Sequence, residues 1–314
     1  MPKIRQALSL NNYLILIFLS FSLILFNSFY LSDSVLAQAE SQNYFITAKK
    51  TAALQEKNKN LKIIDLRSSL SYLFGHLPNA VHIQPENLRN PDGWVAGLMP
   101  EAEFFSNLMQ AKGINNDSRI IIYADQESSA LAARLWWLFN FYGKKQVQIL
   151  SGGYQSWQQA GYDNNKLPPQ IEKGNFTVQS VNNKWLISLD TIAENLDNQD
   201  YLIIDARPAA EFSGEIESEA AVRKGHLPGS INLQIPFSIS ELIERRSELK
   251  SFFQQANLRS SGQKIVILAD QSYNSALTFL ALSYAGYNNL KLADAGWTGW
   301  SFRSDLPIST EENN

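Results

Sequence analysis

Beyond residue 40, short apolar runs rich in β-branched residues alternate with longer segments of helical periodicity. The short runs are typical of buried parallel strands, and the longer Ala-, Leu- and Trp-rich segments predict helices. The predicted strands are Lys62–Leu66, Arg119–Tyr123, Val147–Leu150, Leu202–Asp205, Lys264–Leu268 and Leu290–Leu292, and the predicted helices are Ser129–Tyr142 and Ser275–Ala285. Strand, helix and strand in close succession predict an α/β fold in which helices cover both faces of parallel sheets.

The same pattern occurs twice, with an offset of about 140 to 150 residues. Four matched segments recur in the same order, which indicates a duplicated domain rather than a short-period solenoid. The matches are Ile63–Arg67 with Ile203–Arg207, Gly75–Asn79 with Gly225–Gly229, Ala124–Leu131 with Ala269–Leu277, and Gly152–Trp157 with Ala295–Trp300. Gly143 and Gly286 stand where the central helix of each copy should end.

Composition shifts divide the chain further. We expect a first domain over residues 40–165, a linker over 166–184 with Pro168, Pro169 and Gly174, and a second domain over 185–306. Residues 307–314 are expected to form a frayed tail.

Residues 1–39 differ from the rest. Lys3 and Arg5 precede an apolar run from Tyr13 to Phe26, and Ala37 and Ala39 follow as small residues that suit signal peptidase. The segment is either a cleaved signal peptide or a retained N-terminal membrane anchor. In both cases the rest of the chain is expected outside the cytoplasm, since basic residues favour a cytoplasmic N-terminus.

Composition excludes several classes of function. A net charge of −3 and a pI near 5.7 give no basic surface for nucleic acid, so we expect none as a partner, and membrane contact only through residues 1–39. The chain has no cysteine, which excludes disulfides, a lipobox and every thiol mechanism. No ligand cluster or phosphate loop predicts a metal or cofactor.

Asp-x-Arg at residues 65–67, Gly-His-x-Pro at 75–78 and Gly-Gly-x-x-x-Trp at 152–157, all repeated in the second half, resemble a rhodanese domain. Segments 133–137 and 185–190 are similar to the thiosulfate and 3-mercaptopyruvate sulfurtransferases, and the resemblance covers about residues 44 to 302. It implies two rhodanese-like domains. It also implies a sulfur shuttle, in which a cysteine directly after the central strand of the second domain carries a persulfide in a cradle of backbone N–H groups.

The chain departs from that pattern where the chemistry should occur. The position of the family's cysteine falls on Ala269 or Asp270, neither of which is a thiol, so no catalytic residue is expected. Glu211 stands where many mercaptopyruvate-type members have a substrate-binding arginine. The first copy carries Asp125 and Glu127 in its own loop. A carboxylate about 4 Å from a bound anion would repel it by roughly 1–4 kcal/mol.

A ligand could still use the polar loop of the second copy. The candidate ligand-binding residues are Asp270, Gln271, Ser272, Tyr273, Asn274, Ser275 and Arg223. Other conspicuous residues are assigned structural roles. Asp125 and Asp270 are expected to cap helices or form Asx turns, His76 and His226 to hold turns, Arg67 and Arg207 to tie strands, and Trp136, Trp137, Trp157, Trp297 and Trp300 to fill cores.

Three functions remain open at this point. The first is a non-catalytic module that binds a partner protein or small ligand through the loop and the domain cleft. The second is thiosulfate or 3-mercaptopyruvate sulfur transfer, as a residual activity or assisted by a partner's thiol. The third, a phosphatase-like hydrolase, conflicts with the missing cysteine that such enzymes on related folds also use.

Overall fold

The computed structural model describes residues 44–256, 258, 262–270 and 273–310, with the side chain of Glu127 left out. The predicted signal segment and the loop residues Gln271 and Ser272 lie outside this range. Within it, the helices are all too short or too polar to cross a membrane.

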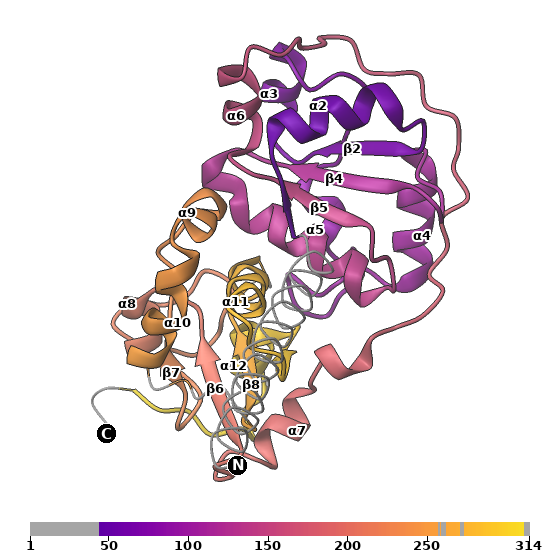
Figure 1. Ribbon diagram of the computed structural model, residues 1–314. Coiled ribbons are helices and arrows are strands. Elements are labelled where there is room, and N and C mark those ends of the chain that lie inside the picture. The colour runs from indigo at the N-terminus through magenta and orange to yellow at the C-terminus, as the bar shows by residue number, and fades with distance from the viewer. Residues whose placement is uncertain (1–43, 257, 259–261, 271–272, 311–314) are drawn as a thin grey trace, which may run out of the picture. The chain divides into compact units, whose positions relative to one another are not determined.

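The first copy, residues 44–165, is built on a five-stranded parallel sheet in the order β1-β5-β4-β2-β3 (Figure 1). Its strands are β1 (Phe45–Ile46), β2 (Leu61–Asp65), β3 (Ala80–His82), β4 (Arg119–Tyr123) and β5 (Val147–Leu150). Its helices are α2 (Ala48–Lys57), α3 (Ser69–Phe74), η1 (Pro85–Leu88), α4 (Ala102–Ala111), η2 (Gln126–Ser128), α5 (Ser129–Phe141) and α6 (Gly153–Gln159). Buried apolar residues lie on both faces of this sheet, which confirms the predicted class.

The second copy, residues 185–310, has a four-stranded parallel sheet in the order β7-β6-β8-β9. Its strands are β6 (Tyr201–Asp205), β7 (Ile231–Asn232), β8 (Lys264–Leu268) and β9 (Leu290–Leu292). Its helices are α7 (Leu189–Ala193), α8 (Ala209–Ser213), α9 (Ile239–Glu244), α10 (Arg246–Gln255), α11 (Tyr273–Tyr284) and α12 (Gly296–Phe302). The central helix begins two residues earlier than predicted, so part of the expected ligand loop is helical.

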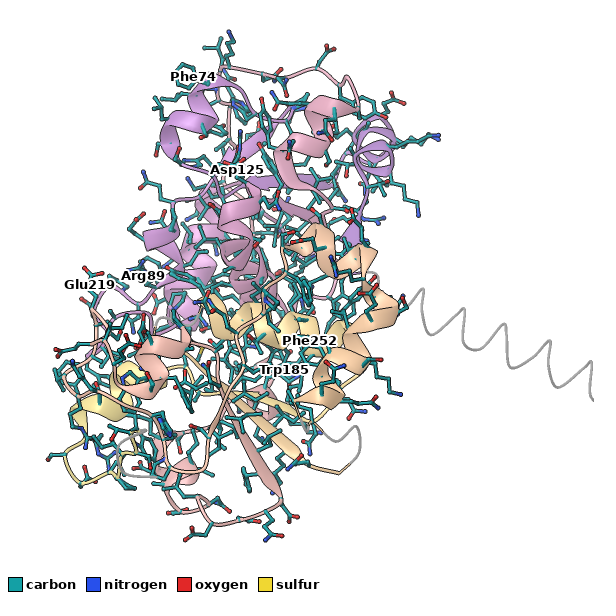
Figure 2. All side chains as sticks on the ribbon, turned by 90° about the vertical axis from the view of Figure 1, so that its left-hand side faces the viewer. Phe74, Arg89, Asp125, Trp185, Glu219 and Phe252 are labelled. Atoms are coloured by element: carbon teal, nitrogen blue, oxygen red, sulfur yellow. The ribbon has the colours of Figure 1, made fainter. Side chains whose placement is uncertain are left out.

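The two copies share a core. The apolar central helices α5 and α11 pack against each other, and one cluster of buried residues continues from the first sheet through both helices to α10. Trp185, labelled in Figure 2, stacks on Trp136. Its ring is tilted against those of Trp137 and of Phe279 in α11. All five tryptophans predicted as core are buried.

The connecting segments differ in part from expectation. Residues 166–182 form no helix or strand, as a linker should, before the short helix η3 (Asn183–Trp185). The prediction of a frayed tail is wrong for its first residues. Ser309 and His226 exchange two backbone hydrogen bonds of 2.9 Å, and Trp300 Nε1 donates to the carbonyl of Pro307. The chain end is thus held against the Gly-His turn, at least to Ser309.

Candidate functional site

The loop that follows β8 is held by α12. The backbone N–H of Trp297 donates to the carbonyl of Ala269 at 2.9 Å, and Thr298 Oγ1 donates to the carbonyl of Asp270 at 2.9 Å. Gly296 makes this approach possible, because a Cβ at that position would lie 1.8 Å from the Ala269 oxygen. Ala269 is buried, so the position next to β8 holds a methyl group with no reactive atom.

Glu211 of α8 meets Asp270 from this loop. Burial and a side-chain hydrogen bond with Asp270 raise the pKa of Glu211 to about 7. A hydrogen bond between two carboxyl groups requires a proton, and the raised pKa means that Glu211 holds this proton more readily than an exposed glutamate does. Glu211 Oε2 and Asp270 Oδ1 are buried, and neither atom has a hydrogen-bond partner among the described residues. The site therefore presents acidic oxygens, a poor match for an anionic sulfur donor.

Arg207 lies close enough to Glu211 to favour its charged form, and Nε and Nη2 of its guanidinium are bound within the fold. It pairs with Asp205 at 2.6 Å, and the same Nη2 donates to the carbonyl of Gly225 at 2.7 Å. Its guanidinium lies 4.4 Å from the ring centroid of Trp297. The Asp-x-Arg motif therefore ties the end of β6 to the Gly-His turn, which confirms its predicted structural role.

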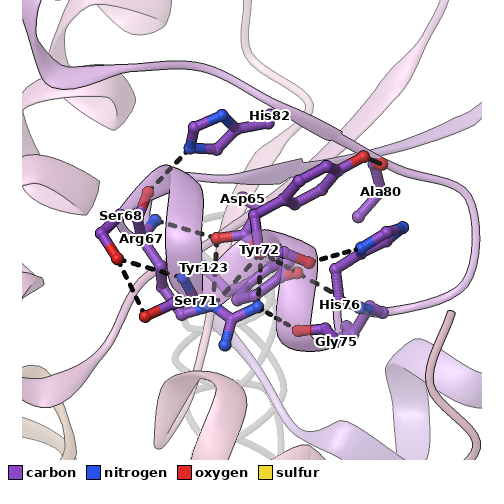
Figure 3. A network of polar contacts seen from close by, with 11 residues as sticks. Asp65, Arg67, Ser68, Ser71, Tyr72, Gly75, His76, Ala80, His82 and Tyr123 are labelled. Atoms are coloured by element: carbon purple, nitrogen blue, oxygen red, sulfur yellow. Dashed lines mark hydrogen bonds and ion pairs between the residues drawn. The ribbon is translucent and has the colours of Figure 1, made fainter. Parts of the chain in front are cut away.

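The first copy repeats this arrangement (Figure 3). Arg67 pairs with Asp65 at 2.7 Å and donates to the carbonyl of Gly75 at 2.6 Å, while Tyr123 donates to Asp65. Tyr154 stands where the second copy has a tryptophan, 3.6 Å from the Arg67 guanidinium carbon. Burial, followed by the charge of Asp65, raises the pKa of Tyr123. This tyrosine therefore remains a neutral donor.

Both predicted turn histidines are confirmed as structural. His76 stacks on Tyr72 with ring centroids 3.9 Å apart, and its Nδ1 lies 2.9 Å from the Tyr72 carbonyl. His226 stacks on Phe212 in the same way, with Nδ1 2.8 Å from the Phe212 carbonyl. Across the part of the chain that the structure describes, no three His, Cys, Asp or Glu residues form a metal-binding group.

The structure places the candidate ligand residues of this loop in different surroundings. Asp270 faces Glu211, and Gln271 and Ser272 are not described. Tyr273 belongs to the interface between copies: its hydroxyl accepts a 2.6 Å hydrogen bond from Arg89 Nε of the first copy (Figure 2). Asn274 is exposed on the first turn of α11, while Ser275 is buried with no hydrogen-bond partner for its Oγ.

Arg223 is not brought together with the loop residues. Its guanidinium donates to four backbone carbonyls at the end of α12 and beyond, those of Trp300, Ser301, Arg303 and Leu306. These bonds saturate most of its donors and anchor the end of α12.

The equivalent loop of the first copy is largely filled. Ser238–Ser240 at the start of α9 and the Asp125 loop line a cavity of only about 20 Å³. Asp125 occupies the N-cap position of η2, as predicted, although no side-chain capping hydrogen bond is found there. Its carboxylate instead acts on the charge of Arg67. The sequence did not predict that the start of α9 would cover the Asp125 loop, because this contact depends on how the two copies pack.

A family model described as the rhodanese-like domain matches residues 47–160 and again residues 188–302. Over 252 residues, the chain is 31% identical to 3-mercaptopyruvate sulfurtransferase of Escherichia coli, covering 78% of this chain and 86% of that protein. It is 29% identical over 266 residues to thiosulfate sulfurtransferase of Corynebacterium glutamicum, covering 81% and 86%.

Solved structures show the same architecture. A crystal structure of 3-mercaptopyruvate sulfotransferase from Escherichia coli aligns with a TM-score of 0.70 at 26% identity, covering 82% of this chain and 99% of that one. The anaerobic ergothioneine biosynthesis enzyme of Chlorobium limicola, in complex with trimethyl histidine, aligns with a TM-score of 0.73 at 18% identity. It covers 86% of this chain and 71% of that one, and at this identity the likeness concerns the fold alone.

Proposed function

The chain belongs to the rhodanese-like family, and we propose that it works as a binding module on a tandem rhodanese scaffold, without carrying sulfur itself. One observation carries this proposal: none of its 314 residues is a cysteine. A persulfide carrier needs a thiolate that attacks the donor and then bears the sulfur. Ala269 and Asp270 offer a methyl group and a carboxylate at that place.

The surroundings of Asp270 support the same conclusion. Thiosulfate and 3-mercaptopyruvate are anions, and the Glu211–Asp270 pair faces them with acidic oxygens in a partly buried site. The proton that the pair shares removes only one of its two charges. The guanidinium of Arg207, which acts on Glu211, is held by Asp205 and Gly225. Loss of the nucleophile therefore coincides with loss of anion affinity.

The proposed binding surface lies between β8 and the first turn of α11, where Asp270 and Asn274 are the described polar residues that a ligand would meet. A protein partner or small ligand would meet the acid pair and the exposed Asn274 there. We further propose that the chain acts outside the cytoplasm, after export directed by residues 1–39, either released by cleavage or tethered by that segment.

The catalytic half of the proposal is tested by thiocyanate formation. The purified chain is incubated with cyanide and either thiosulfate or 3-mercaptopyruvate, beside a heat-inactivated sample and the Escherichia coli relative as positive control. We expect no turnover above the inactivated sample. Sulfur transfer by the chain alone, proportional to its concentration and without any added thiol protein, would establish the alternative function and refute the proposal.

The binding half is tested by site-specific photo-crosslinking in the producing cells. A photoreactive residue replaces Asn274 in one chain and the exposed Asn289 of the same copy in a control chain. We expect a discrete adduct at position 274 that the substitution Asp270→Ala abolishes and position 289 does not give. Equal patterns at both positions, or an adduct indifferent to Asp270→Ala, would argue against this surface.

A further inference from the structure

A separate pocket opens at the amino-terminal end of β2 in the first copy. It encloses about 300 Å³, and its polar lining includes Gln55, Asn58, Lys59, Lys62, Asn79 and Lys112. The strand partner β3 begins at Ala80, opposite Ile63, so the first two residues of β2 extend beyond it. The linker between α6 and α7 passes this edge and adds residues 169–171 to the wall (Figure 1).

The charge of this pocket is one-sided. Three lysines line it, and none of its described lining residues is acidic. Among the described residues, no ion pair or side-chain hydrogen bond involves Lys59, Lys62 or Lys112. Burial lowers the pKa of Lys112, with no carboxylate to offset it. Three cationic side chains thus line one pocket without an acidic lining residue to neutralise them, and a bound anion would do so.

The duplication provides an internal comparison. The residues of the second copy that correspond to Lys59 and Lys62 are Gln199 and Leu202, counted from the matched strands. Lys112 is the C-cap of α4, and the C-cap of the corresponding helix α10 is Ala256. All three cations are thus present in one copy and absent from the other. The shared fold does not require them.

The backbone of Asn79 is a second feature that distinguishes this pocket from the matching region of the second copy. It has a φ of 59°, the single positive value among the described residues other than glycine. The corresponding residue of the second copy is Gly229, with a φ of 74°, which adopts this backbone without a steric cost. The first copy therefore retains a side chain where glycine would be more relaxed, and the amide lines the lysine pocket.

We propose that this pocket binds a small phosphate-bearing anion through Lys59, Lys62 and Lys112, with an amide donor from Asn79. Lysine is a point charge that suits phosphate oxygens from several directions, whereas planar carboxylates are typically held by the fork of arginine, which this pocket lacks. The pocket lies at the amino-terminal end of β2, whereas the loops that follow the parallel strands, including the Asp125 loop, lie at their carboxyl-terminal ends. The proposal is therefore independent of the function assigned to the loop after β8.

The test is titration calorimetry of the whole chain with inorganic phosphate and with pyrophosphate, at low ionic strength. We expect pyrophosphate to bind and the double substitution Lys62→Gln/Lys112→Gln to weaken it by roughly tenfold to a hundredfold, the loss typical of one or two charge-assisted hydrogen bonds. The matched control is Lys49→Gln/Lys250→Gln, which removes the same charge from exposed positions outside the pocket. Affinity in the control should stay within about twofold of the natural chain.

A second measurement needs no variant. Lysine acylation of the natural chain is followed by mass spectrometry with and without pyrophosphate, and we expect protection of Lys62 and Lys112 but not of Lys49. Absence of pyrophosphate binding, equal losses in both double variants, or uniform protection of all three lysines would each overturn the proposal.

Discussion

Arg134 of α5 donates through Nη2 to Oδ1 of Asp294 at 2.9 Å, joining two residues 160 positions apart in different copies of the repeat. Both side chains are buried. Asp294 Oδ2 also accepts the backbone N–H of Met99 at 2.6 Å, and the Arg134 guanidinium lies 5.4 Å from the ring centroid of Trp137. The pair thus links the helix in the shared core to the start of α12, which holds the loop of the candidate site.

Removing one member of this pair should destabilise the whole unit. Asp294→Ala leaves the Arg134 charge buried without its partner, which typically costs about 3–5 kcal/mol. Urea unfolding monitored by tryptophan fluorescence measures the change. The matched control is Glu248→Gln, which breaks the exposed pair with Arg245 and should change the free energy of unfolding little. The double variant Arg134→Met/Asp294→Ala should lose less free energy of unfolding than the sum of the losses of Arg134→Met and Asp294→Ala measured separately. Losses that simply add would contradict the coupling between the two side chains.

Gly296 should be irreplaceable for a reason that ordinary turn glycines do not share. Both Gly296 and Gly229 have positive φ, but only at Gly296 would a Cβ meet a backbone atom, the carbonyl oxygen of Ala269. Gly229→Ala should cost about 1–2 kcal/mol for the left-handed backbone alone. Gly296→Ala should cost at least about 2 kcal/mol more, because the loop after β8 or α12 must shift. Comparable thermal unfolding of the two variants would disprove the close approach.

The sequence predicted the duplicated α/β fold well, because hydrophobic periodicity and repeated motifs are local signals. Four of the six predicted strands have the observed ends and β2 and β6 differ by one residue, whereas the short strands β1, β3 and β7 were not predicted. The predicted core tryptophans are buried. Contacts between segments that are far apart in the sequence could not be predicted from these local signals. Nothing in either segment indicates that Glu211 and Asp270 lie together, since 59 positions separate them and α8 sets their approach.

Two further differences have the same origin. Arg223 stands beside the Gly-His motif in the sequence, but its donors are taken by carbonyls near the end of α12. The segment after Pro307 resembles a frayed tail by composition, yet backbone pairing with His226 holds it as far as Ser309. Backbone partners carry no side-chain signature, so composition alone could not reveal either contact.

Restoring a thiol should restore sulfur transfer only in part. Ala269→Cys places the thiol directly after β8, and Asp270→Cys places it one residue later and removes one carboxylate. We expect little activity from Ala269→Cys alone, because Glu211 and Asp270 remain to repel thiosulfate. Adding Glu211→Gln/Asp270→Asn should raise its kcat/KM by about tenfold or more, the equivalent of about 1.4 kcal/mol. The same pair of substitutions without the cysteine is the control and should stay inactive. An unchanged kcat/KM would show that the acid pair is not the obstacle.

The Glu211–Asp270 pair should make stability fall as pH rises through neutrality. Burial and the hydrogen bond with Asp270 raise the pKa of Glu211 to about 7 in the folded chain, above the value of about 4.3 in an unfolded chain. The folded state therefore binds more protons between these values, and its free energy of unfolding decreases from about pH 4.5 to pH 7. Glu211→Gln keeps the side-chain volume and removes the titration, so it should raise stability at pH 8 by about 1 kcal/mol, a figure reduced for solvent screening, and change little at pH 4.5. Urea unfolding at both pH values measures this, with Glu217→Gln as the control at an exposed position of the same segment. A Glu211→Gln chain less stable than the natural one at pH 8 would mean that the carboxylate is favourably solvated or paired there, and that no proton is shared near neutral pH.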